Sequence, residues 1–174
     1  MSDVTIRRVA ALGMITLRGD LGVLGAATAR VVGLDAPEMR MSVAEGHARL
    51  LWMSPDELLL TGPAAGIADW AKALTDVLGD DFATVAIVSD ARAVFDLDGP
   101  QVPDLLAKLC PVDFDALAAA EVRRTRLAQV AAAFWREGSG WRLVCFRSVA
   151  DYVEAALRNA ADAPMPGLYA PSRG

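Results

Sequence analysis

An internal repeat limits what this chain can fold into. The residues Ile67-Ala68-Asp69-Trp70 return 82 positions later as Val149-Ala150-Asp151-Tyr152, and each set begins a segment with the apolar spacing of an amphipathic helix. The same shift places Val23, Leu24 and Ala27 on Leu105, Leu106 and Leu109, and Trp52 on Phe134. A repeat of this length predicts two similar halves, about 3–80 and 82–162, with pseudo-twofold symmetry.

The first half is expected to alternate strands and helices. Strands are predicted over 14–18, 39–43, 48–53 and 57–61 from their apolar runs and alternation. A helix over 21–32 should be capped by Asp20 and ended by Gly33, and a second helix from Ile67 should be ended by Gly79.

The second half is expected to follow the same order. Strands are predicted over 84–88, 92–98, 125–136 and 141–146, with a hairpin turn over 137–140. A helix should start at Gly99-Pro100 and stop before Pro111, and Ser148 with Asp151 should form a capping box for the last helix. Alanine favours a helix over 127–133, and only the following hairpin argues for a strand there.

The predicted fold class is therefore α+β: two ferredoxin-like βαβ halves with antiparallel hairpins. They should form a single domain over 1–164, followed by an irregular tail over 165–174.

Composition excludes several classes of partner. The 174 residues are 54% hydrophobic and carry a net charge of −5, so neither disorder nor nucleic-acid binding is expected. No apolar run is long enough for a membrane helix. Arg7 and Arg8 before the apolar run 9–17 imitate a signal peptide, but Arg18-Gly19-Asp20 replaces a cleavage site, and the run is interpreted as a strand. The widely spaced Cys110 and Cys145 fit a reducing compartment, and the cytoplasm is the expected location.

The residues that could carry chemistry are few. His47 is the only histidine, and no nucleophile accompanies it in the sequence, so an exposed or structural role is favoured over a catalytic one. One histidine and two distant thiols predict no metal site. Gly19, Gly22 and Gly25 lack the spacing of a nucleotide-binding loop and are interpreted as close helix packing. No catalytic, cofactor-binding or metal-binding residue is predicted.

The remaining charged and aromatic residues receive structural interpretations. Lys72 and Lys108 are placed on solvated helix faces, and Arg123, Arg124 and Arg126 on a sheet edge or a partner contact. The acidic pairs Asp56-Glu57, Asp80-Asp81 and Asp113 with Asp115 are interpreted as turn residues. Trp70 is assigned to the core, whereas Trp135 and Trp141 are predicted to lie on an uncovered face suited to a protein interface.

An ordered set of motifs resembles a known family. The set comprises Trp52-Met53-Ser54-Pro55-Asp56-Glu57-Leu58-Leu59-Leu60, Val88-Ser89-Asp90-Ala91-Arg92, Gly99-Pro100, Leu105 to Asp113, and Arg147-Ser148 with Tyr152. In this order it resembles the γ subunit of heterotetrameric sarcosine oxidase, over about nine tenths of the chain. That family is similar in fold to the folate-binding aminomethyltransferase of glycine cleavage, which is itself duplicated.

The resemblance implies a subunit without an active site of its own. In such complexes FAD, FMN, NAD and tetrahydrofolate are expected on partner subunits, the δ subunit carries zinc, and the γ subunit packs against the large α subunit beside β and δ. The complex oxidises the N-methyl group of sarcosine at a flavin, reduces oxygen to hydrogen peroxide, and releases glycine and a one-carbon unit for tetrahydrofolate. The alternative is a stand-alone folate-binding module, although the Lys-Gly-Cys-Tyr type loop of its iron-sulfur branch is absent. Self-association of the isolated chain stays open.

Overall fold

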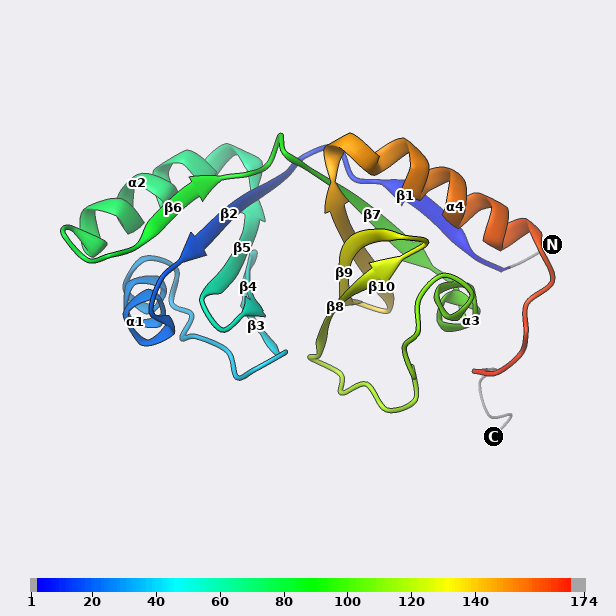
Figure 1. Cartoon of the computed structure of the whole chain (residues 1–174). Coiled ribbons are helices and arrows are strands. Elements are labelled where there is room, and N and C mark those ends of the chain that lie inside the picture. The colour runs from blue at the N-terminus through cyan, green and yellow to red at the C-terminus, as the bar shows by residue number, and fades with distance from the viewer. Residues whose placement is uncertain (1–2, 170–174) are drawn as a thin grey trace. The chain divides into compact units, whose positions relative to one another are not determined.

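The computed structural model describes residues 3–169 and divides them into two compact units (Figure 1). One unit is the continuous segment Ala10–Asp90, and the other combines residues 3–9 with residues 91–169. The chain therefore starts in the discontinuous unit, passes through the whole of the continuous unit, and returns. All strand pairs are antiparallel, which confirms the α+β class.

The continuous unit is one five-stranded sheet with two helices. Its elements are β2 (Leu12–Arg18), α1 (Leu21–Val32), β3 (Ser42–Glu45), β4 (Ala48–Ser54), β5 (Glu57–Pro63), a 3-10 turn at Ala64–Gly66, α2 (Ile67–Leu78) and β6 (Thr84–Ile87). The strands lie in the order β3-β4-β5-β2-β6. Leucines and isoleucines of β2, β4 and β5 form one core with Leu24 of α1 and Leu74 of α2.

The predicted caps of α1 and α2 are confirmed. Asp20 accepts hydrogen bonds from the backbone N–H groups of Gly22 (2.9 Å) and Val23 (3.1 Å), which lack partners inside the helix. Gly33 ends α1 with a φ of 73° and Gly79 ends α2 with a φ of 53°, a backbone region that favours glycine.

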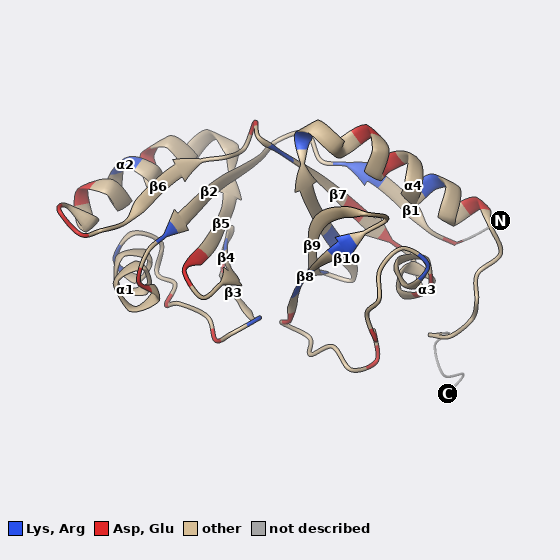
Figure 2. Cartoon of the chain, viewed as in Figure 1, with Lys and Arg blue, Asp and Glu red and all other residues tan. Residues whose placement is uncertain are grey.

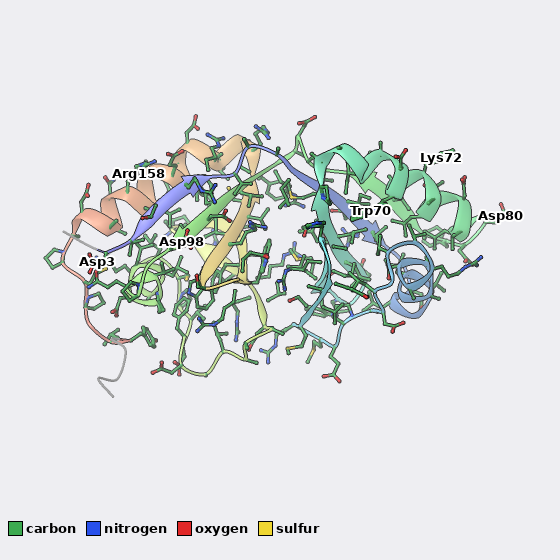
Figure 3. All side chains as sticks on the ribbon, turned by 180° about the vertical axis from the view of Figure 1, so that it is seen from behind. Asp3, Trp70, Lys72, Asp80, Asp98 and Arg158 are labelled. Carbon is green, nitrogen blue, oxygen red and sulfur yellow. The ribbon has the colours of Figure 1, made fainter. Side chains whose placement is uncertain are left out.

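A close contact joins α2 to its sheet. Gly13 of β2 and Gly62 of β5 stand opposite each other in the ladder. A Cβ atom on Gly62 would lie 2.3 Å from Cζ3 of Trp70, and one on Gly13 would lie 2.8 Å from Cβ of Ile67. Figure 3 shows Trp70 on the side of α2 toward the strands. The two glycines thus leave the space that the first turn of α2 fills.

The discontinuous unit has the same order of elements from β7 to α4, but its edge strand β1 comes first in the chain and not last. It contains β1 (Thr5–Arg8), β7 (Arg92–Asp98), α3 (Val102–Ala107), β8 (Val122–Leu127), β9 (Val130–Glu137), β10 (Gly140–Phe146), a 3-10 turn at Arg147–Val149 and α4 (Ala150–Asp162). Its sheet order is β1-β7-β10-β9-β8, with the N-terminal β1 paired to β7. Phe114, Phe134 and Trp141 form an aromatic cluster in its core, with ring centroids 5.5–5.8 Å apart.

Elements of the two units recur within one residue of the offset expected from the repeat. A shift of 82 carries the start of β4 (Ala48–Ser54) onto that of β9 (Val130–Glu137), and a shift of 83 carries the start of α2 (Ile67–Leu78) onto that of α4 (Ala150–Asp162). The strand orders also correspond, because β3-β4-β5-β2-β6 matches β8-β9-β10-β7-β1. This recurrence is what a duplicated chain would produce.

Three local predictions are corrected. The strand over 84–88 was expected to open the second half, but β6 pairs with β2 in the continuous unit. The predicted capping box at Ser148 does not form: α4 begins at Ala150 without a side-chain cap, and Asp151 instead accepts a hydrogen bond from Arg8 (3.1 Å). The predicted strand over 125–136 is broken by a tight turn at Ala128-Gln129, although the segment from Val130 is a strand and not a helix.

The turn between β8 and β9 places two ordinary residues at positive φ. Ala128 has a φ of 45° and Gln129 a φ of 86°, where glycine or asparagine is usual in a two-residue hairpin. Two neighbours hold the turn. The N–H of Ala128 donates to the carbonyl of Leu109 (2.9 Å), and the carbonyl of Ala128 accepts from the hydroxyl of Tyr152 in α4. Tertiary contacts therefore enforce a turn for which the sequence carries no local signal.

We expect Gly62→Ala to destabilise the chain by about 1–3 kcal/mol, because the new methyl group must displace the Trp70 ring. Urea unfolding measures this change. Gly66→Ala is the matched control, since a Cβ atom added there would have no neighbour within 4 Å and its φ of −99° suits alanine. Equal stability of the two variants would contradict the close-contact interpretation.

We expect the double variant Ala128→Asn with Gln129→Gly to stabilise the chain by about 1 kcal/mol, because both new residues tolerate positive φ. The opposite change in the next hairpin, Gly138→Ala, should destabilise the chain, because Gly138 has a φ of 59°. No atom lies within 4 Å of the added Cβ, so the loss reports the backbone conformation alone. Thermal unfolding compares the three proteins. An unchanged or lower melting temperature for the double variant would refute the assigned strain.

Candidate functional site

The single histidine lies in an exposed turn of the continuous unit. His47 is exposed in the turn between β3 and β4, beside Gly46 with its φ of 58°. It directly precedes Ala48, the first residue of β4. The described residues contain no group of three or more His, Cys, Asp and Glu side chains arranged to hold a metal ion.

Both thiols are buried in the discontinuous unit. Cys110 follows α3 and donates to the carbonyl of Leu106 (3.0 Å), and Cys145 lies on β10. Burial raises the pKa of Cys110 to about 12 and the pKa of Cys145 to about 11, because the thiolate would lose its hydration. Both sulfurs are therefore protonated and poorly nucleophilic at neutral pH.

One glycine of the predicted packing set serves as expected. A Cβ on Gly25 would lie 2.7 Å from Cβ of Ala36, so α1 packs closely against the segment that follows it. Gly22 lies instead beside the capping carboxylate of Asp20. Gly19 has a φ of 148° and approaches the backbone carbonyl of Phe82. The three glycines therefore have three separate structural roles.

The two lysines differ in their surroundings. Lys72 is exposed on α2, where its ammonium pairs with Asp76 at 2.6 Å, and this neighbour raises the pKa of Lys72 (Figure 3). Lys108 was also expected to be solvated, and this expectation is wrong. Its ammonium donates to the carbonyls of Ala160 (2.6 Å) and Ala163 (2.9 Å), at the carboxyl end of α4.

The segment after α4 is tied back to α3. Asp104, which is 2% exposed, accepts hydrogen bonds from the backbone N–H groups of Leu168 (2.7 Å) and Tyr169 (3.2 Å). The ring of Tyr169 meets that of Phe114 edge to face at 5.6 Å. The tail expected to be irregular has no helix or strand over 163–169, yet it is anchored; residues 170–174 lie outside the described part.

The arginine cluster lies on a sheet edge, as expected. Arg123, Arg124 and Arg126 belong to β8, the last strand of its sheet. Arg123 pairs with Glu121 at 2.7 Å, and Arg126 donates to the carbonyl of Gln129 at 2.8 Å.

The acidic pairs serve mainly as turn residues. Asp56 lies in the turn between β4 and β5, where the hydroxyl of Ser54 (2.6 Å) and the guanidinium of Arg18 (2.7 Å) hold its pKa below the usual value. Asp113 accepts from the N–H of Asp115 (3.1 Å), which closes a local turn. Glu57 is the exception, because it is buried at the first position of β5.

The expected aromatic interface is not formed by Trp135 and Trp141. These side chains are 1% and 4% exposed, respectively. Trp141 belongs to the aromatic cluster, and the indole N–H of Trp135 donates to Glu137 (2.9 Å). Among the described aromatic residues Phe146 and Tyr152 are partly exposed, and Phe82, which sequence reasoning missed, is fully exposed in the turn between α2 and β6.

A hollow of about 570 Å³ lies next to Phe82 in the continuous unit. It is lined by Arg18, Gly19, Asp20, Asp56, Phe82, Ala83 and Thr84. Arg18 and Asp56 neutralise each other across it, and these lining residues include neither a histidine nor a cysteine. The fully exposed ring of Phe82 adds an apolar surface beside these charged groups.

Comparison with known proteins shows the family of this chain. The model of the sarcosine oxidase gamma subunit family matches residues 18–163. The chain belongs to this family. The sarcosine oxidase gamma subunit of Corynebacterium sp. strain P-1 is 36% identical over 141 residues, covering 78% of this chain and 68% of that protein. The gamma subunit of an Arthrobacter species is 34% identical over 141 residues, again covering 78% of this chain and 68% of that protein.

Solved structures agree with the family. A chain of heterotetrameric sarcosine oxidase from Corynebacterium sp. U-96, solved with pyrrole 2-carboxylate, matches this sarcosine oxidase gamma family chain with a TM-score of 0.84 and 28% identity, over 91% of this chain and 84% of that one. Aminomethyltransferase T from Bartonella henselae matches with a TM-score of 0.69 and 14% identity, over 90% of this chain and 45% of that one. The second match shows the fold alone and confirms the aminomethyltransferase-like class.

Among the described residues of this chain, no helix is long and apolar enough to cross a membrane.

We expect both thiols to resist modification by Ellman's reagent in the native protein and to react after denaturation.

The raised pKa values of the two thiols also predict that the free energy of unfolding falls above about pH 9. There the unfolded chain releases the thiol protons while the folded chain keeps them, at up to about 1.4 kcal/mol per pH unit for each thiol. Comparing urea unfolding of the wild type with Cys110→Ala and Cys145→Ala isolates this dependence. An identical pH slope in all three proteins would contradict it.

Proposed function

We propose that this chain is the gamma subunit of a heterotetrameric sarcosine oxidase and that it has a structural, non-catalytic role. The observation that carries the proposal is the match over 91% of the chain to a chain of a heterotetrameric sarcosine oxidase, at 28% identity. Its direct partner is the large α subunit, with β and δ in the same complex. The complex oxidises sarcosine with oxygen to glycine and hydrogen peroxide and passes a one-carbon unit to tetrahydrofolate.

The way this chain uses its reactive groups supports a structural role. Asp20 caps a helix, Asp104 and Lys108 anchor the tail and the end of α4, and both thiols are protonated in the core. These groups are committed to holding the fold, and a catalytic group needs instead to reach a substrate. FAD, FMN, NAD and tetrahydrofolate are accordingly assigned to the partner subunits, and the complex to the cytoplasm.

A stand-alone folate-binding module of one-carbon metabolism is the second candidate. The fold shared with aminomethyltransferase T favours it, at a TM-score of 0.69. The low identity of 14% transfers no binding residue to this chain. The two candidates differ in whether the chain needs a partner to act.

We expect the chain to be retained in equal amount with a tagged α subunit when the four subunits are produced together. Size-exclusion chromatography with quantified gels measures the ratio. The isolated chain should not bind tetrahydrofolate in isothermal titration at about micromolar concentrations. Absence of the chain from the tagged complex would refute the proposal, and micromolar folate binding by the chain alone would favour the second candidate.

His47→Ala in the complex should leave sarcosine-dependent peroxide production unchanged, and a loss would overturn the non-catalytic assignment.

A further inference from the structure

One edge strand of the continuous unit lacks the charges that the other edges carry. Each described sheet has two edge strands: β1 and β8 in one, β3 and β6 in the other. Arginines occupy β1 and β8, and Glu45 ends β3. The sequence of β6, Thr-Val-Ala-Ile, has no charge and no proline (Figure 2). Charged side chains and prolines normally prevent a sheet edge from pairing with another chain, so β6 is the unprotected edge.

The hydrogen-bond pattern shows which backbone groups of β6 point outward. Val88 N–H donates to the carbonyl of Met14 (2.8 Å), and the ladder pairs Thr84 with Arg18 and Ala86 with Thr16. Bonded and non-bonded positions alternate along an antiparallel strand. The N–H and C=O groups of Val85 and Ile87 therefore point away from β2, where an added strand would find them.

Apolar side chains lie beside the same edge. Phe82 is fully exposed just before β6, and Ile87 at its end is 51% exposed. The hollow of about 570 Å³ opens next to Phe82. An added strand would thus gain backbone hydrogen bonds from β6, an aromatic contact at one end, and a hollow for one of its own side chains.

The charge at this end is negative. Asp80 and Asp81 are exposed in the turn between α2 and β6 (Figures 2 and 3). The last turn of α2 contains no basic residue, and Lys72 is already paired with Asp76. Acidic groups at the carboxyl end of a helix add to the negative end of its dipole. A positive group from outside would relieve this accumulation.

We propose that the outer edge of β6 binds an extended apolar segment of a neighbouring subunit, with a Lys or Arg at the end that lies beside Asp80 and Asp81. The identity of that neighbour as a sarcosine oxidase subunit rests on the proposed function. A second copy of this chain is the poorer occupant. In parallel pairing its Asp80 and Asp81 would face their own counterparts, so acid would oppose acid. In antiparallel pairing the segment that follows its own β6, Val88 to Ala91, carries no basic residue to offer them.

The test uses the complex with a tagged α subunit. Ile87→Lys places a charge on the free edge, and Phe82→Ala removes the exposed ring. Each should weaken retention of the chain by about tenfold in a dilution series. Asp80→Lys with Asp81→Lys should weaken it similarly and more strongly at low salt. Met39→Lys is the matched control, because Met39 is also an exposed large apolar residue (67%) of the same unit, away from β6.

A photo-crosslinking experiment identifies the occupant. Phe82→p-benzoylphenylalanine in the assembled complex should crosslink to a partner-subunit peptide that contains an apolar run next to Lys or Arg, as read by mass spectrometry. Crosslinking to a second copy of this chain, or to a peptide without that pattern, would overturn the proposal.

The outcomes separate this inference from the proposed function. If the wild-type chain is not retained with the α subunit, the proposed function fails. If the wild type is retained and the Phe82, Ile87 and acidic variants are retained equally well, the function stands and the β6 proposal is overturned. Phe82→Ala decides the matter should Ile87→Lys unfold, since the ring of Phe82 is fully exposed and circular dichroism should be unchanged.

Discussion

Close packing between helix and sheet is the constraint on which both units depend, and the two units satisfy it with different residues. In the continuous unit the helix supplies the large residue, Trp70, and the sheet supplies the space at Gly62. In the discontinuous unit the core contains Phe134 and Trp141 of the sheet together with Val153 and Leu157 of α4. Interiors are close-packed, so each unit needs its own matching set of side chains around the same arrangement of strands.

The two long helices show where the sequence repeat and the structure differ. The shift of 82 places Tyr152 at the position of Trp70, but α2 begins at Ile67 and α4 at Ala150, one residue more than this shift. Counted from the helix start, the counterpart of Trp70 is therefore Val153, which is fully buried. Tyr152 is 49% exposed, and its hydroxyl donates to the carbonyl of Ala128 in the turn between β8 and β9. The sequence repeat thus predicts the helix but not which of its residues faces the core.

This difference explains how far the sequence could be interpreted. Local signals sufficed for the ends of α1, since Asp20 and Gly33 act through their own backbone neighbours. The turn at Ala128 could not be found, because its positive φ is enforced by Leu109 and Tyr152, which lie far away in sequence. The pairing of β6 with β2 is equally nonlocal.

The aromatic surface was predicted in the wrong place for a related reason. Trp135 and Trp141 flank a hairpin, a position that is often exposed, but β9 and β10 carry buried residues on both faces. Phe82 drew no attention because it follows Asp80 and Asp81 in an evident turn. The available signal was the combination: an uncharged strand directly after an acidic turn with an aromatic residue.

That combination also connects fold and function. The corresponding edge strands of the two sheets come from different parts of the chain. In one sheet this strand is β1, near the N-terminus, and in the other it is β6, which follows α2. Both become edges, yet only β1 carries arginines, and Arg7 pairs with Asp96 at 2.8 Å beside it. If both edges faced only water, both would need protection against pairing with other chains. An edge without protection avoids unwanted pairing when another chain already occupies it. In a family of subunits that form a complex, a neighbouring subunit can be that chain.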